Sequence, residues 1–169
     1  MKHQHHSRRR VQAGFSLIEL LIVVAIVGIL AAVAVPKLLK NLETGRETAA
    51  IQTLRTVHNN QAQFSAMKGK FGTLADLREA ALIDGNYAGG SAVSGYIYTS
   101  TEATPDQYCV QSTRSSATTA SRDFNVIEDG TIRYVEAKTP SPVPHGGGAE
   151  LAGGGAGSAT GKEAPKTAP

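Results

Sequence analysis

Residues 15 to 36 read FSLIELLIVVAIVGILAAVAVP and contain only two polar side chains, those of Ser16 and Glu19. A bilayer core is crossed by roughly 20 helical residues, so this stretch is long and apolar enough to span a membrane. The stretch before it, MKHQHHSRRRVQAG at residues 1 to 14, is basic and contains no acid. Because positively charged flanks stay in the cytoplasm, we expect the N-terminus inside and the rest of the chain outside.

Three simpler explanations compete for this segment. It could be a secretory signal cut near Ala34, a twin-arginine signal built on residues 7 to 10, or a plain single-span anchor. A carboxylate such as that of Glu19 costs roughly 2 to 3 kcal/mol at bilayer depth, and a disposable signal has no reason to carry it. A plain anchor also leaves the order of Gly14, Phe15 and Glu19 to chance.

The stretch from Gly14 to Pro36 closely resembles the N-terminal signature of type IV pilins and of the pseudopilins of type II secretion. The resemblance implies that a prepilin peptidase cuts between Gly14 and Phe15 and methylates the new amino group of Phe15. It also implies that Glu19 is the acidic residue used in assembly and that Pro36 loosens the helix in assembled filaments.

Physical chemistry supports these roles. Gly14 has no side chain to obstruct a membrane protease. When subunits stack in an apolar core, the Glu19 carboxylate can pair with the cationic amine of Phe15 on a neighbour, which offsets the desolvation of both charges. Pro36 cannot donate a hydrogen bond to the preceding turn, and Gly28 lowers helix propensity. We therefore expect a kink or local opening between Gly28 and Pro36, although a tolerated membrane kink explains the same residues.

An amphipathic pattern follows Pro36, and its apolar positions recur every three or four residues or at multiples of those spacings. They are Leu39, Leu42, Ala50, Leu54, Val57 and Phe64. The pattern predicts a helix continuing to about Met67. A helix from Phe15 to Met67 would be roughly 80 Å long, more than a bilayer requires, so its second half must pack on something outside the membrane.

The remaining pattern predicts a small antiparallel sheet. Thr73 and Asp76 form a capping box for a short helix that we expect to reach Gly85, with a glycine-rich loop after it. Alternating strands are expected at residues 96–99, 107–112, 124–127 and 131–135. The last two flank Glu128, Asp129 and Gly130, a strong hairpin signal. We predict an α+β, pilin-like fold in which a long N-terminal helix, first transmembrane and then amphipathic, packs on this sheet.

Four segments follow from these patterns: a prepilin leader at 1–14, a transmembrane and assembly helix at 15–36, a globular head at 37–138, and a tail at 139–169. The tail is rich in Gly, Ala and Pro and has hardly any large apolar residue. We expect it to be disordered because nothing offsets the entropy of ordering it.

The net charge of +3 comes from the leader, which holds four of the 17 basic residues. The chain from Phe15 onward has 13 bases against 14 acids, or about −1. This balance gives no support for nucleic-acid binding.

Cys109 is the only cysteine, so no intramolecular disulfide can form. Many type IV pilins close a C-terminal loop with a disulfide, and this chain departs from them there. We expect Cys109 to be a small buried side chain rather than a reactive thiol.

No His, Cys, Asp and Glu cluster has metal-ligand spacing, so neither a metal nor a cofactor is expected. Asp123, Glu128 and Asp129 could approach calcium, but their spacing is not that of a dedicated calcium loop, and turn chemistry alone accounts for Asp129 and Gly130. No partnered nucleophile or nucleotide-binding motif is present, so we expect no enzyme activity.

The sequence thus favours a major or minor structural subunit of a type IV pilus. A type II secretion pseudopilin is the alternative, although the chain contains no tryptophan and so lacks the tryptophan-containing C-terminal motif of the major pseudopilin. A membrane-anchored or exported binding module is the further alternative. The expected partners are the prepilin peptidase, an inner-membrane assembly platform and other copies of the chain. The precursor would lie in the bacterial inner membrane, and the filament in the periplasm or at the cell surface.

Overall fold

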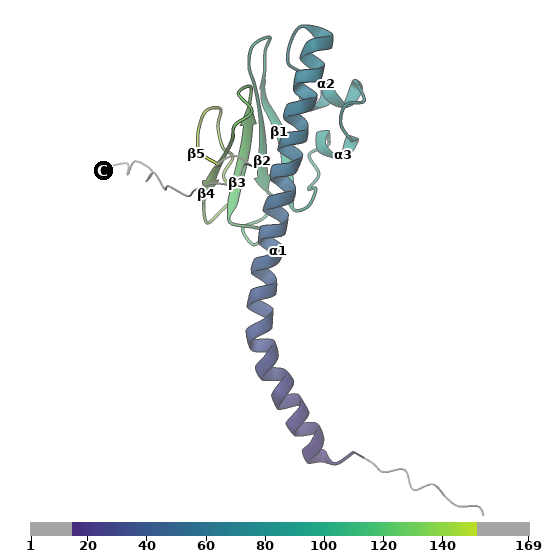
Figure 1. Ribbon diagram of the computed structural model, residues 1–169, viewed down its shortest axis with the longest axis vertical. Coiled ribbons are helices and arrows are strands. Elements are labelled where there is room, and N and C mark those ends of the chain that lie inside the picture. Colours follow the sequence, from purple (N-terminus) through teal and green to yellow (C-terminus); the bar gives the residue numbers. More distant parts are fainter. Residues whose placement is uncertain (1–14, 152–169) are drawn as a thin grey trace, which may run out of the picture. The chain divides into compact units, whose positions relative to one another are not determined.

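The computed structural model describes residues 15–151 (Figure 1). The elements, in chain order, are α1 (Leu17–Lys68), α2 (Leu74–Glu79), α3 (Gly85–Ala88), β1 (Tyr96–Ala103), β2 (Tyr108–Arg114), β3 (Arg122–Ile127), β4 (Ile132–Glu136) and β5 (Ala149–Glu150). The chain divides into two compact units, the first ending at Lys40 and the second, which we call the head, beginning at Asn41. The expected α+β, pilin-like fold is confirmed.

The five strands form an antiparallel sheet in the order β1-β2-β3-β4-β5, so each strand pairs with its neighbour in sequence. The predicted hairpin joins β3 to β4. Its turn contains Gly130 at φ +72°, a backbone conformation that favours glycine. The Asp129 carboxylate accepts a hydrogen bond from the backbone N–H of Thr131 at 2.7 Å, which closes the turn.

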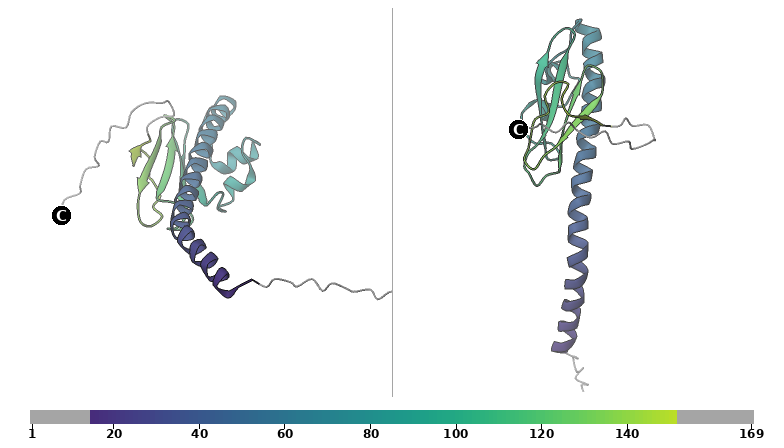
Figure 2. Two further views of the ribbon diagram at one scale, coloured as in Figure 1. Left: turned by 60° about the horizontal axis from the view of Figure 1, so that its bottom comes forward. Right: turned by 90° about the vertical axis from the view of Figure 1, so that its left-hand side faces the viewer.

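One face of α1 packs on the sheet within the head (Figures 1 and 2). Its buried residues are Glu47, Ala50, Leu54, Val57, Gln61 and Phe64. The core on the sheet side consists of Tyr96, Tyr98, Tyr108, Val110, Phe124, Val126 and Ile132. The stripe is shorter than the sequence predicted, because Leu39 and Leu42 are exposed.

Two buried polar side chains fasten α1 to the rest of the head. The Glu47 carboxylate accepts hydrogen bonds from the backbone N–H groups of Ser121 and Arg122, from the Ser121 hydroxyl, and from the Arg122 guanidinium. The Gln61 amide donates to the carbonyl of Gly72 at 2.6 Å and accepts from the Gly72 N–H at 3.0 Å. Hydrogen bonds of this kind satisfy groups that would otherwise be costly to bury.

The segment after α1 agrees in part with the sequence prediction. Thr73 and Asp76 form the predicted capping box, and hydrogen bonds from the Thr73 backbone and hydroxyl lower the pKa of Asp76. The short helix was predicted to reach Gly85, but α2 ends at Glu79 because Ala81 has φ +57°, which a right-handed helix cannot contain. The predicted loop includes the one-turn helix α3, for which Asp84 is the N-cap.

The prediction that the chain is disordered from Thr139 onward is wrong for residues 139 to 151, which we call the strap. Val143 is fully buried, and β5 pairs with Arg133 and Tyr134 of β4. The argument from composition failed because the strap is held mainly by hydrogen bonds that sheet side chains make to its main chain. Such bonds do not require apolar side chains in the strap. The rest of the predicted tail lies outside the described residues.

We predict that Glu47→Gln lowers the free energy of unfolding of the head by about 1 to 3 kcal/mol, because the ion pair with Arg122 is lost while the helix remains in place. Urea unfolding of the full chain in detergent, followed by tyrosine fluorescence, measures this change. Glu43→Gln, one turn earlier on α1, is the matched control and should change stability by less than about 0.5 kcal/mol. Equal stabilities of the two variants would contradict the fastening role.

Candidate assembly helix and head surface

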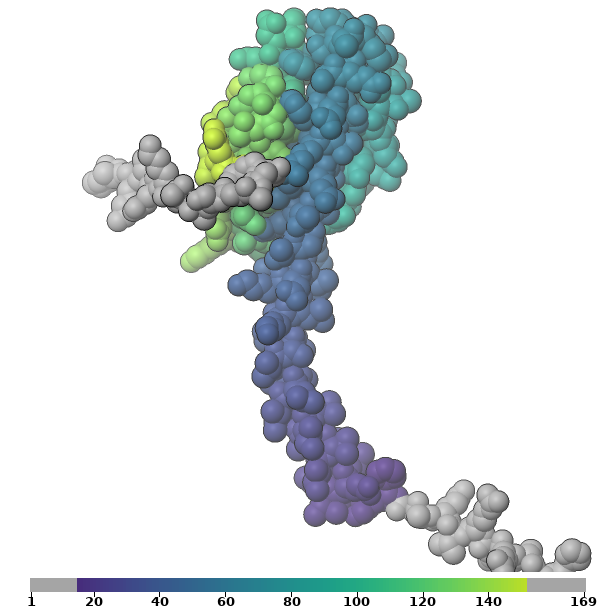
Figure 3. All heavy atoms as spheres, viewed as in Figure 1, coloured from purple at the N-terminus to yellow at the C-terminus, as the bar shows by residue number. Residues whose placement is uncertain are grey.

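Exposed large hydrophobic side chains are concentrated at the start of α1. Among the described residues, every one of them except Met67 lies between Phe15 and Leu42. By length and composition, α1 can cross a membrane, and its most apolar window has no buried residue. Figure 3 shows one face of this segment, with its side chains at the surface. So much apolar surface on a single helix must be covered by lipid or by other protein.

Phe15 and Glu19 lie at the start of this helix. Phe15 is 79% exposed and precedes the first helical residue, and Glu19 is the acid of the first turn. The Ser16 carbonyl accepts hydrogen bonds from the N–H groups of Glu19 and Leu20 at 3.1 and 3.2 Å. A carboxylate in the first turn interacts favourably with the positive end of the helix dipole. Gly14, the predicted cleavage residue, lies outside the described residues.

The helix is continuous through Gly28 and Pro36. No opening interrupts the helix near these residues, and melting within a filament stays a prediction. A Cβ atom added to Gly28 would meet no atom within 4 Å. Packing among the described residues thus gives no reason for glycine at this position.

The acids near the β3–β4 hairpin do not converge on one point. Asp123 pairs with Arg114, and Asp129 pairs with Arg133, whose guanidinium lowers the pKa of Asp129. The third acid, Glu128, lies 3.0 Å from the His145 Nε2 atom. Across residues 15–151, no group of three or more His, Cys, Asp and Glu residues has the arrangement needed to hold a metal ion.

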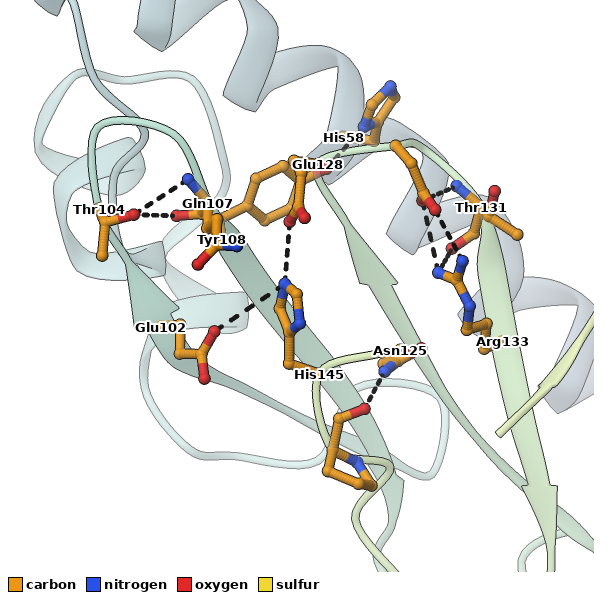
Figure 4. Close-up of polar contacts among 12 residues, drawn as sticks. His58, Glu102, Thr104, Gln107, Tyr108, Asn125, Glu128, Thr131, Arg133 and His145 are labelled. Carbon is orange, nitrogen blue, oxygen red and sulfur yellow. Dashed lines mark hydrogen bonds and ion pairs between the residues drawn. The ribbon is translucent and has the colours of Figure 1, made fainter. Parts of the chain in front are cut away.

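Figure 4 shows the polar contacts at this end of the sheet. His145, from the strap, lies between Glu128 and Glu102, with its Nε2 atom 3.9 Å from the Glu102 carboxylate. Burial alone would raise the pKa of Glu128, but hydrogen bonds from backbone N–H groups and from His145 outweigh burial and lower it. On the other side of the sheet, the His58 Nδ1 atom is 2.6 Å from the Tyr108 hydroxyl oxygen, so His58 packs against the sheet.

Cys109 is fully buried in β2, as the sequence predicted. Burial raises the pKa of its thiol, which keeps the sulfur protonated and unreactive at neutral pH.

The head also has a surface pocket of about 400 Å³ between α1 and the segment around α3. Its polar lining includes Thr53, Thr56 and Asn60, and its apolar lining includes Leu82 and Tyr87. Asn60 is already engaged, because its amide donates to the Leu82 carbonyl at 2.7 Å.

The sequence analysis missed the strap and the residues that hold it, above all Gln111, Asn125 and Val143. One signal was available. Prolines at 140, 142 and 144 form a regular alternation around Val143, which is typical of an extended segment rather than of a flexible tail.

Comparison with known proteins finds a family motif at the N-terminus and a similarity to a pilin. Residues 9–35 match the family described as the prokaryotic N-terminal methylation motif. Over 63 residues, the chain is 40% identical to the type IV major pilin protein PilA of Myxococcus xanthus (strain DK1622). That alignment covers 37% of this chain and 29% of the relative, so it spans under a third of the pilin's own length.

We predict that replacing both Val23 and Val27 by lysine strongly reduces retention of the chain in membranes. The two side chains lie one turn apart, and two lysines near the middle of a span cost on the order of 5 to 7 kcal/mol. Alkaline extraction of the membrane fraction measures retention. Thr48→Lys with Gln52→Lys, at the same spacing on the exposed side of α1 in the head, is the matched control and should leave retention unchanged. Full retention of the Val23 and Val27 variant would argue against a membrane-spanning segment.

Proposed function

We propose that this chain, which carries the N-terminal methylation motif ahead of a pilin-like α+β head, is a structural subunit of a type IV pilus or a related filament. It is made as a precursor, cut after Gly14, methylated on the amino group of Phe15 and polymerised through its N-terminal helix. The observation that carries this proposal is the combination of the motif at residues 9–35 with an apolar helical segment that is exposed along its whole length.

Assembly through this helix gives the exposed apolar surface a place in the filament core. Burying such surface stabilises association by roughly 25 cal/mol per Å² of apolar area. Because apolar contact has no direction, a charge pair is needed to choose the axial register. Glu19 can supply it by accepting the cationic amine of Phe15 from a neighbouring subunit in surroundings where either charge alone would be destabilising.

The proposal implies specific partners. A prepilin peptidase acts on the precursor, an inner-membrane assembly platform extracts the mature subunit, and other copies of the chain receive it. The basic leader keeps the precursor's N-terminus in the cytoplasm, with the head on the other side of the inner membrane. In this function the chain is the substrate of an enzyme and has no catalytic role itself.

A pseudopilin of type II secretion is the second candidate, since it would share the motif and the helix. The similarity to a major pilin and the absence of tryptophan from the sequence favour the pilus. Detection of the mature chain in sheared surface filaments supports a pilus subunit, whereas confinement to the periplasm with a simultaneous secretion defect in a deletion strain supports the pseudopilin.

We predict that the mature chain begins at Phe15 and carries one added methyl group. Intact-mass and N-terminal analysis of the membrane fraction, with and without a prepilin peptidase, measures both features. The methylated species should disappear when the peptidase is absent. A chain that begins near Val35 would instead indicate an exported module, and an uncut chain would indicate a plain anchor.

We predict that Glu19→Ala leaves cleavage intact but lowers incorporation into filaments by about tenfold or more, because a few kcal/mol of charge pairing are lost at each contact. The ratio of filament to membrane-pool subunit measures incorporation. Glu43→Ala, which lies outside the apolar segment, is the control and should assemble normally. Normal assembly of Glu19→Ala subunits would show that the pairing is not required.

A further inference from the structure

The strap is held by side chains of the sheet that bind its main chain. The Asp123 carboxylate accepts the backbone N–H of Ser141 at 2.8 Å. The Gln111 amide donates to the Val143 carbonyl at 2.9 Å, and the Asn125 amide donates to the carbonyls of Val143 and Pro144 at 3.3 and 2.7 Å. The side chains of Gln111, Asp123 and Asn125 thus form a site for an extended peptide backbone, which we call the strap site.

The strap has the sequence features that such a site requires. Pro140, Pro142 and Pro144 lack backbone N–H groups, so carbonyl oxygens are the main polar groups that this stretch presents. Proline also fixes φ near −65°, which favours an extended conformation and reduces the entropy lost on binding. Between two of the prolines, Val143 is fully buried and acts as the single apolar anchor. Main-chain hydrogen bonds combined with one side-chain pocket are a recurrent mode of peptide recognition.

The strap covers the polar side chains of its site and pairs their donors. Asn125 is fully buried, Gln111 is 6% exposed, and their amide donors are satisfied by the strap carbonyls. The Oδ1 atom of Asn125 already has no hydrogen-bond partner. Any occupant that covers these amides must also pair them, because an unpaired buried polar group costs about 1 to 3 kcal/mol. The site therefore selects segments that offer carbonyls in the same arrangement.

Noncovalent contacts also hold both ends of the strap on the sheet. At its start, Arg114 donates to the Thr139 carbonyl at 2.8 Å. Toward its end, His145 contacts Glu128, and β5 pairs with β4. None of these described contacts is a covalent bond, so the strap can leave the sheet without any chemical step.

We propose that the strap site is a peptide-binding site for an extended, proline-spaced segment, occupied in this chain by its own strap and able to accept the strap of a second copy. The strap of the same chain is normally favoured because its effective concentration is high. Once that strap is displaced, the strap of a second copy offers the same carbonyls and the same valine anchor. The proposal concerns an exchangeable contact between heads and does not depend on how the N-terminal helices assemble.

Two substitutions in the strap should empty the site without altering it. Val143→Asp places a charge at the buried anchor. Gly148→Ala adds a Cβ atom 2.8 Å from the Tyr134 carbonyl oxygen at φ +89°, a conformation that alanine rarely adopts. Both variants keep Gln111, Asp123 and Asn125.

The experiment measures binding of a fluorescent peptide with the sequence of residues 137–151 to the full chain in detergent micelles. We expect each variant to bind this peptide at least tenfold more tightly than the unchanged chain, whose site is filled. Adding Asn125→Ala to either variant should abolish the gain, because the donor to Val143 and Pro144 is removed. A peptide carrying the Val143→Asp change is the matched ligand control and should not bind.

Cys109 provides an independent readout of the same site. It lies on β2 two residues before Gln111, and because side chains alternate along a strand, both belong to the same face of the sheet. Its thiol should react with a maleimide faster in both variants, and added peptide should slow the reaction again.

Two results would overturn the proposal. In the first, the variants unfold cooperatively and expose Cys109, yet the peptide binds no better than its Val143→Asp control. In the second, both variants lose cooperative unfolding, which would show that the strap is an inseparable part of the core. Normal cleavage, methylation and filament assembly alongside either result would leave the proposed function standing.

Discussion

The contact between the buried stripe of α1 and the sheet supports everything else in the head. Leu54, Val57 and Phe64 are buried along one helix face, and complete burial of such side chains is worth roughly 1.5 to 3 kcal/mol each. The sheet has five short strands and needs a cover for one face, which α1 supplies. The helix that we propose to enter a filament is therefore also the helix around which the head folds.

Apolar contact alone would not fix the position of α1 along the sheet, because hydrophobic packing has little directional preference. Glu47 and Gln61 supply that direction. The Glu47 carboxylate binds donors of Ser121 and Arg122, and Gln61 binds both polar groups of the Gly72 backbone. A shift of one residue along the helix would leave these buried groups unpaired, so the two contacts define one register between helix and head.

The sequence predicted those features that are determined by residues close together in the chain, and it missed those that depend on distant partners. The capping box at Thr73 and the turn at Gly130 were predictable because neighbouring residues determine them. The roles of Glu47 and Gln61 were not predictable from the sequence. A polar residue on a helix is expected to be exposed unless its distant partner is known. The motif at the start of the chain directed attention to Phe15 and Glu19. Their pairing is proposed between two copies, so it has no counterpart in the fold of one head.

The strap shows where composition arguments fail. The strap is held largely through its main-chain groups, which every residue carries, so the amino-acid content of residues 139–151 gave no measure of its stability. What distinguishes the strap is order rather than content: three prolines at alternate positions expose the carbonyls, and Val143 between them is the anchor. A disulfide would hold one chain's end to its own sheet permanently. Hydrogen bonds to a main chain select the same order of residues without fixing which copy supplies it. This is why we propose that the strap of a second copy can replace the chain's own.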